Sequence, residues 1–142
     1  MEKTRGANVN AAMTRHIVAN VRDIPPGERL IVDVAGRSIG VFNVAGHFYA
    51  VKNSCPHQGG PLCQGRTIGL AVAERPGEIA YHREGEILRC PWHGWEFDLA
   101  TGRSVVDPAR TRVKSYPVAV EELQAETYPV EIERERVVVI LT

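Results

Sequence analysis

The sequence contains only three cysteines in 142 residues, an odd and small number that excludes the disulfide framework of a secreted scaffold. It also lacks an excess of either charge, because 17 lysines and arginines balance 17 aspartates and glutamates. A nucleic-acid-binding surface normally needs a basic excess, so nucleic acid is not the expected partner. No segment approaches the roughly 18 consecutive apolar residues of a membrane span, and residues 1–13 lack the apolar centre of a signal peptide. We therefore expect a cytoplasmic protein that does not enter a membrane.

The length of the chain fits one domain with a hydrophobic core of its own. Apolar residues make up 44% of the sequence and charged residues 24%, which is typical of a globular protein. We expect residues 1–14 to form a disordered tail and residues 15–142 to form the domain.

Most of the sequence consists of short β-branched segments separated by turn residues. The predicted strands are residues 17–21, 29–34, 38–44, 47–51, 87–90, 95–99, 118–120, 130–133 and 137–141. Ala45-Gly46 is expected to be a hairpin loop, residues 134–136 a short connection, and residues 121–126 a single helical turn. No stretch longer than two turns keeps a helical apolar period, so the sequence predicts an all-β sandwich or small barrel.

Charge is unevenly distributed along the chain, although it sums to zero. Residues 103–114 carry four basic side chains against Asp107, whereas residues 121–136 carry six glutamates against two arginines. These segments are either solvated faces or the two ends of a dipole that steers a protein partner.

Two short Gly- and Pro-rich segments carry the recognisable chemistry. Cys55 and His57 form a C-x-H motif in CPHQGGPL, and Cys90 and His93 form a C-x-x-H motif in CPWHGW. Thiolate and imidazole together suit zinc or an iron–sulfur cluster, whereas carboxylates suit magnesium or calcium. The single residue between Cys55 and His57 fits ligands of two different irons better than two corners of one zinc tetrahedron, so a zinc site is the less favoured alternative.

The remaining histidines and cysteine have no such context. We expect His16, His47 and His82 to be ordinary surface or strand residues, and Cys63 to be a small buried side chain.

The two loops, together with the segment FDLATG at 97–102, resemble the cluster-binding loops of the Rieske 2Fe–2S family, especially its soluble bacterial oxygenase-ferredoxin branch. The similarity runs from about residue 17 to residue 141. It implies one 2Fe–2S cluster, with Cys55 and Cys90 on the inner iron and His57 and His93 on the outer iron. It also implies a small antiparallel β domain that carries both loops at its tip.

The resemblance implies a one-electron carrier that passes electrons from a reductase to a terminal oxygenase or a related enzyme. After Thr142 the sequence offers no chain for a catalytic domain, so we do not expect a stand-alone enzyme. Two other functions stay open: an accessory subunit similar to the small subunits of nitrite reductases, and a redox regulatory module.

The chain departs from the family in the spacing of its motifs. Between His57 and Cys90 lie 32 residues, more than is usual in oxygenase ferredoxins. The excess falls at residues 64–89, where two turn-like segments, 75–78 and 83–86, predict a longer hairpin. This extension is either a tolerated surface loop or a docking arm beside the cluster.

The loops also indicate how the cluster is tuned. Rieske proteins of respiratory complexes carry a disulfide at the positions of Gly60 and Trp92, and hydroxyl donors at the positions of Trp95 and Phe97. Their absence predicts a low reduction potential.

Three further residues near the loops have predicted positions. Trp95 is expected to pack in the core, and Trp92 either shields the cluster or forms part of a docking surface. Pro108, in a third loop, is the candidate for covering the cluster.

Overall fold

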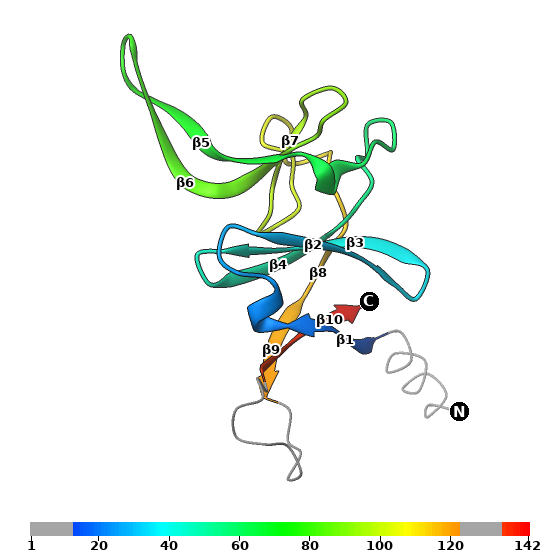
Figure 1. Ribbon diagram of the computed structural model, residues 1–142. Coiled ribbons are helices and arrows are strands. Elements are labelled where there is room, and N and C mark those ends of the chain that lie inside the picture. Colours follow the sequence, from blue (N-terminus) through cyan, green and yellow to red (C-terminus); the bar gives the residue numbers. More distant parts are fainter. Residues whose placement is uncertain (1–12, 123–134) are drawn as a thin grey trace, which may run out of the picture.

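The structure is a computed structural model that describes residues 13–122 and 135–142 (Figure 1). Its described part is built from strands with two short 3₁₀ turns. The elements are β1 (Thr14–Asn20), η1 (Val21–Asp23), β2 (Arg29–Val34), β3 (Arg37–Val44), β4 (His47–Lys52), η2 (Leu62–Gln64), β5 (Arg66–Arg75), β6 (Glu78–Arg89), β7 (Glu96–Asp98), β8 (Ser115–Tyr116), β9 (Val118–Glu122) and β10 (Glu135–Leu141).

The strands form three antiparallel sheets. Their orders are β1-β10-β9, β2-β3-β4-β8 and β5-β6-β7. In Figure 1 the sheet of β2, β3 and β4 lies between the β1-β10-β9 sheet below and the β5-β6-β7 sheet above. The predicted all-β class is therefore confirmed, and the sheets stack as a three-layered arrangement.

Strand β3 is the centre of this arrangement, because both of its faces are covered. Residues 39–43 are all buried. Side chains alternate along a strand, so Ile39 and Val41 face one neighbouring layer while Gly40 and Phe42 face the other. Burial of each large apolar side chain stabilises the fold by about 1.5–3 kcal/mol.

Two hydrophobic cores result, one on each side of the middle sheet. The base-side core contains Ile24, Val34, Ile39, Val41, Ala50, Tyr116, Val137, Val139 and Leu141. The loop-side core contains Phe42, Val51, Cys55, Leu62, Cys63, Leu88, Cys90, Phe97, Leu99 and Val113. Since Cys55 and Cys90 belong to the second core, the two motifs are anchored in the packed interior.

Most of the predicted strands are confirmed within one or two residues at each end. Residues 29–34 form β2, residues 37–44 and 47–52 form β3 and β4, and Ala45-Gly46 closes their hairpin. Ala45 and Gly46 both have positive φ, as a tight two-residue hairpin turn requires.

Two predictions near the C-terminus are wrong for the residues that the structure describes. Glu121 and Glu122 belong to β9 and not to a helical turn. Glu135 and Arg136 belong to β10 and not to a connection, because they pair with β9. The predicted strand at residues 130–133 lies outside the described residues.

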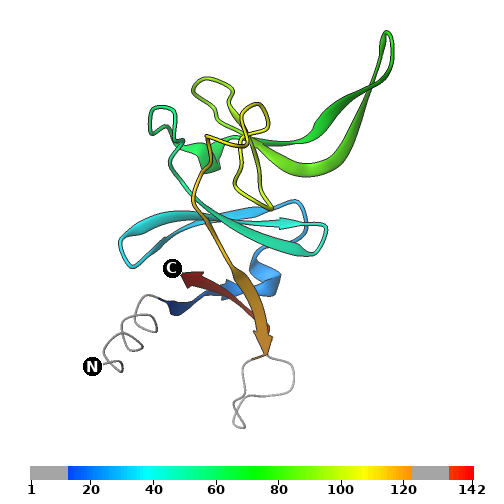
Figure 2. The ribbon, with the colours of Figure 1, turned by 180° about the vertical axis from the view of Figure 1, so that it is seen from behind.

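The extension at residues 64–89 forms a hairpin of β5 and β6, which projects from the body of the molecule as an arm (Figures 1 and 2). Its tip is the turn at residues 75–78. The second predicted turn, at 83–86, is instead a bulge within β6, with positive φ at Arg83 and Gly85. Arg83 pairs there with Glu86 and Asp98, which joins the bulge to β7.

In the part of the chain that the structure describes, no helix is long and apolar enough to cross a membrane.

Replacement of Gly40 tests the close packing of β3 against η2. An added Cβ would lie 2.4 Å from the Cys63 Sγ and 2.6 Å from its Cβ. Gly40→Ala should therefore destabilise the protein by about 1–3 kcal/mol, seen as a lower Tm. The control Arg37→Ala, exposed on the same strand, should change stability by less than about 0.5 kcal/mol. Equal Tm values for the two variants would show that the close contact is absent.

Candidate metal centre

The first loop (residues 55–60) is closed by its own backbone. The N–H of Cys55 donates to the carbonyl of Gly60 over 2.9 Å, and the N–H of Gly59 donates to the carbonyl of Cys55 over 2.7 Å. Gly59 has φ +77°, a conformation that glycine adopts without strain. The loop therefore holds Cys55 and His57 on a short, rigid turn.

The second loop (residues 90–95) repeats the same hydrogen bonds. The N–H of Cys90 donates to the carbonyl of Trp95 over 2.7 Å, and the N–H of Gly94 donates to the carbonyl of Cys90 over 3.0 Å. Gly94 has φ +76°, which matches the glycine of the first loop. Two loops from distant parts of the chain thus present a cysteine at the same position of the same turn.

The two cysteine thiols meet below the loops. Cys55 and Cys90 are each 2% exposed and belong to the same core cluster, and the Cys90 thiol is near enough to Cys55 to affect its pKa. Burial, followed by the neighbouring Cys90 thiol, raises the pKa of Cys55, while the backbone N–H groups of His57 and Gln58 act in the opposite direction. These two amides therefore stabilise negative charge on a buried sulfur.

The two histidines lie at the exposed end of the same site. The ring centroids of His57 and His93 are 4.9 Å apart, and the rings meet edge to face at 82°. Trp95 stacks on His57 with centroids 4.4 Å apart and only 13° between the planes. The donors are thus divided into a buried thiol pair and an exposed imidazole pair.

This division fits a cluster of two irons, in which thiolates bind one iron and imidazoles the other. Within residues 13–122 and 135–142, no three Cys, His, Asp or Glu side chains gather closely enough to hold a single metal ion. Thiolate and imidazole are suitable donors for an iron–sulfur cluster, so the chemistry of the four residues agrees with that group.

The third cysteine is separate from this site. Cys63 is completely buried, and its thiol lies 3.6 Å from the carbonyl of Val51. The prediction of a small buried side chain is confirmed. His16, His47 and His82 all lie in strands, as expected.

The tryptophans of the second loop occupy different environments. Trp95 is half-buried and packs on the edge of the loop-side core, so the expected core position is confirmed only in part. Trp92 is 56% exposed, and its ring lies against Gly60, where a Cβ would come within 2.7 Å. The indole ring of Trp92 therefore brings the second loop into contact with the first loop at Gly60.

The predicted role of Pro108 remains a prediction. Pro108 is exposed, and its carbonyl accepts a hydrogen bond from Arg103. Within this segment, Val106 and Asp107 line a recess of about 260 Å³ beside Gly94.

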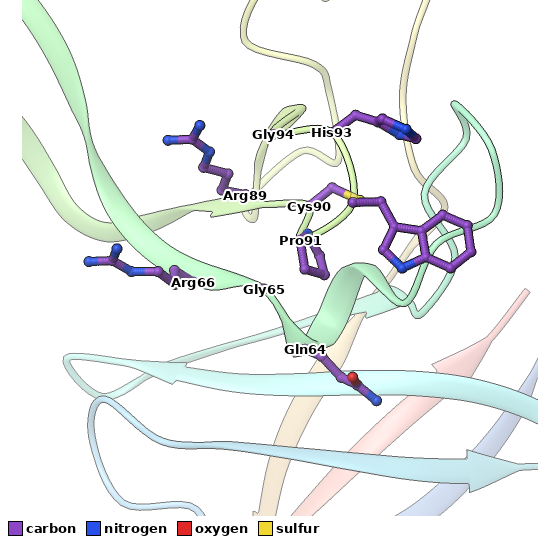
Figure 3. Close-up of a pocket in the computed structure, with 9 residues that line it drawn as sticks. Gln64, Gly65, Arg66, Arg89, Cys90, Pro91, His93 and Gly94 are labelled. Atoms are coloured by element: carbon purple, nitrogen blue, oxygen red, sulfur yellow. The ribbon is translucent and has the colours of Figure 1, made fainter.

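A larger recess, of about 640 Å³, borders the second loop on its other flank (Figure 3). Its lining is Gln64, Gly65, Arg66, Arg89, Cys90, Pro91, Trp92, His93 and Gly94. Arg66 and Arg89 belong to no motif that is recognisable in the sequence. They are 23 positions apart, and only the pairing of β5 with β6 makes them neighbours.

Stacked antiparallel sheets that carry two Cys/His loops at one end define a small iron–sulfur redox protein. The chain belongs to the Rieske family: residues 14–117 match the model of the Rieske 2Fe-2S domain. Its cofactor is one Rieske-type 2Fe–2S cluster.

Several relatives are ferredoxins of dioxygenase systems. The ferredoxin component of the naphthalene 1,2-dioxygenase/salicylate 5-hydroxylase systems of Ralstonia sp is 30% identical over 102 residues, which cover 72% of this chain and 83% of the relative. The 3-phenylpropionate/cinnamic acid dioxygenase ferredoxin subunit of Escherichia coli (strain K12) is 32% identical over 109 residues, which cover 77% and 88%.

Solved structures give the same result. The ferredoxin of carbazole 1,9a-dioxygenase from Nocardioides aromaticivorans IC177 matches with a TM-score of 0.61 and 26% identity, over 88% of this chain and 96% of that chain. A ferredoxin of Sphingomonas yanoikuyae B1 matches with a TM-score of 0.57 and 28% identity, over 76% and 91%. A nitrite reductase small subunit from Mycobacterium tuberculosis shares the fold, with a TM-score of 0.61 over 92% and 96% of the chains, at only 20% identity.

The residues around the loops predict a low reduction potential. A hydroxyl that donates to a cluster sulfur stabilises the more negative reduced state, and Trp95 and Phe97 supply none. The midpoint should lie in the lower part of the family range of about −150 to +300 mV, measured by redox titration. The variants Trp95→Ser and Phe97→Tyr should raise it. A midpoint above roughly +100 mV in the unmodified protein would contradict the prediction.

The buried thiol of Cys63 predicts a loss of stability at alkaline pH. Burial raises the pKa of Cys63 from 9.0 to about 12. Below pH 9 the thiol is neutral in both the folded and the unfolded chain, so its full contribution to the free energy of unfolding is present there. Between pH 9 and pH 12 only the unfolded chain ionises, and the free energy of unfolding falls by about 1.4 kcal/mol per pH unit.

Comparison with Cys63→Ala isolates this effect. Between pH 8 and pH 10.5, the free energy of unfolding should fall by about 2 kcal/mol less in the variant than in the unmodified protein. If the free energy of unfolding falls equally in the two proteins, Cys63 ionises equally in the folded and the unfolded state.

Proposed function

We propose that the protein is a one-electron carrier in which Cys55, Cys90, His57 and His93 hold the 2Fe–2S cluster. The observation that carries this proposal is the division of the four donors into a buried thiol pair and an exposed imidazole pair at one end of the fold. The bound cluster supplies reversible one-electron chemistry near the surface.

The surrounding residues have separate tasks in this function. The backbone N–H groups of His57 and Gln58 stabilise the charge of the Cys55 sulfur. The stacked ring of Trp95 restrains the orientation of His57. The exposed edges of His57 and His93 provide the short exit by which an electron reaches a partner.

The direction of transfer follows from the relatives. They are ferredoxin components of dioxygenase systems, so this chain accepts electrons from a reductase and delivers them to a terminal oxygenase or a related enzyme. The nitrite reductase small subunit shares only the fold, and this chain offers a complete donor set. Electron transfer therefore explains the site better than a purely structural subunit does.

We place the domain at residues 15–142 and include the arm formed within residues 64–89; β1 extends it by one residue, because Thr14 pairs with Leu141. The protein works in solution in the cytoplasm, where the reducing environment keeps its three cysteines free for ligation and packing.

Loaded protein provides the direct test. Protein purified without oxygen should contain two irons and two sulfides per chain, and the reduced form should give a Rieske EPR signal of low average g value. Colourless protein that contains one zinc ion would overturn the proposal.

Replacement of one ligand tests the assignment of residues. His57→Cys should abolish the Rieske spectrum, because a thiolate replaces an imidazole on the outer iron. The control His47→Cys, exposed on β4, should leave the spectrum unchanged. If His57→Cys keeps the spectrum, His57 is not a ligand.

A further inference from the structure

Two arginines face each other across the base of the arm. Arg66 begins β5 and Arg89 ends β6, and they are direct partners in the register of the two strands. Figure 3 shows both side chains among those that line the recess beside the second loop. Like charges directly opposite each other destabilise a strand pair, so this arrangement has a cost for the fold.

The guanidinium of Arg89 is held against the second loop. A Cβ on Gly94 would lie 3.0 Å from its Nη2 and 3.1 Å from its Nε. Because Gly94 directly follows His93, the positive charge of Arg89 lies beside an exposed proposed ligand.

In the part of the chain that the structure describes, no ion pair neutralises these two arginines. Glu96 is the partner of Arg89 in the register with β7, but neither Arg66 nor Arg89 forms an ion pair within the described residues. Arg83, on the same arm, is bound to two carboxylates. Among residues 13–122 and 135–142, the charges of Arg66 and Arg89 are thus not paired with a carboxylate.

We propose that Arg66 and Arg89 bind carboxylate side chains on the surface of the redox protein that exchanges electrons at the second loop. This inference rests on the proposed function, and it identifies the chemistry of the partner: an acidic patch next to its own electron entry or exit.

The size and lining of the recess favour the binding of a protein surface over the binding of a small anion. The recess beside the two arginines is broad, and the exposed ring of Trp92 lines it as well. Exposed aromatic residues are frequent anchors in protein interfaces. Planar guanidinium groups bind carboxylates through paired hydrogen bonds, and such charge pairs accelerate and orient the encounter.

Charged one-electron oxidants test the site without knowledge of the partner. Reduced, cluster-loaded protein is mixed with anionic hexacyanoferrate(III) or with cationic tris(1,10-phenanthroline)cobalt(III). Each complex accepts one electron from the protein, giving iron(II) or cobalt(II). At low ionic strength, Arg66→Gln/Arg89→Gln should slow oxidation by the anion roughly three- to tenfold and accelerate oxidation by the cation. Both changes should disappear at about 0.5 M salt.

The control removes the same charge elsewhere. Arg22→Gln/Arg37→Gln replaces two exposed arginines of η1 and β3, which do not line the recess. It should alter both rates by less than about twofold, because these charges lie outside the recess and act on the oxidant over a longer distance. Equal effects of the two double variants would overturn the inference.

A short acidic peptide distinguishes a protein surface from a small anion. Tetraglutamate should slow oxidation by hexacyanoferrate(III) in the unmodified protein and not in Arg66→Gln/Arg89→Gln. Inorganic phosphate at the same ionic strength should have less effect than the peptide. Equal inhibition by phosphate would indicate a small-anion site and overturn the assignment to a protein partner.

The outcomes also separate this inference from the proposed function. Unmodified protein without a Rieske spectrum would contradict the proposed function itself. A normal spectrum in every variant, with no dependence of the rates on Arg66 and Arg89, would contradict the docking site alone.

Discussion

The contact between the buried thiols of Cys55 and Cys90 is the constraint on which the rest of the structure depends. One cysteine follows β4 of the middle sheet, and the other follows β6 of the upper sheet. Their meeting therefore requires the two sheets to pack face to face. The loop-side core supplies that packing, and Gly40 of β3 allows η2 to approach closely enough.

Much of this organisation could be predicted from the sequence because it depends on local signals. The strands β2, β3 and β4 are apolar segments separated by turn residues, and the structure places them where they were expected. The Cys and His motifs are equally local, since each occupies a turn of six residues closed by its own backbone. Such signals need no knowledge of the tertiary fold.

The features that sequence reasoning missed depend on pairing between distant segments. The residues of β8 form a strand only because they pair with Ala50 and Val51 of β4. The glycine and charged residues at 83–86 are equally compatible with a turn and with a bulge. The ion pair of Arg83 with Asp98 stabilises the bulge. The stacking of Trp95 on His57 similarly joins two loops whose separation in sequence gives no sign of it.

A net charge of zero says little about the field near the loops. Electrostatic interactions in water are screened within about 10 Å at moderate ionic strength, so a partner that approaches the loops responds to the charges beside them and not to the sum over the chain. Arg66 and Arg89 lie at that end. The glutamates of the acidic segment 121–136 are far away in sequence, and the described ones, Glu121, Glu122 and Glu135, belong to β9 and β10 of the base-side sheet. A neutral chain can therefore present a positive surface where electrons leave it.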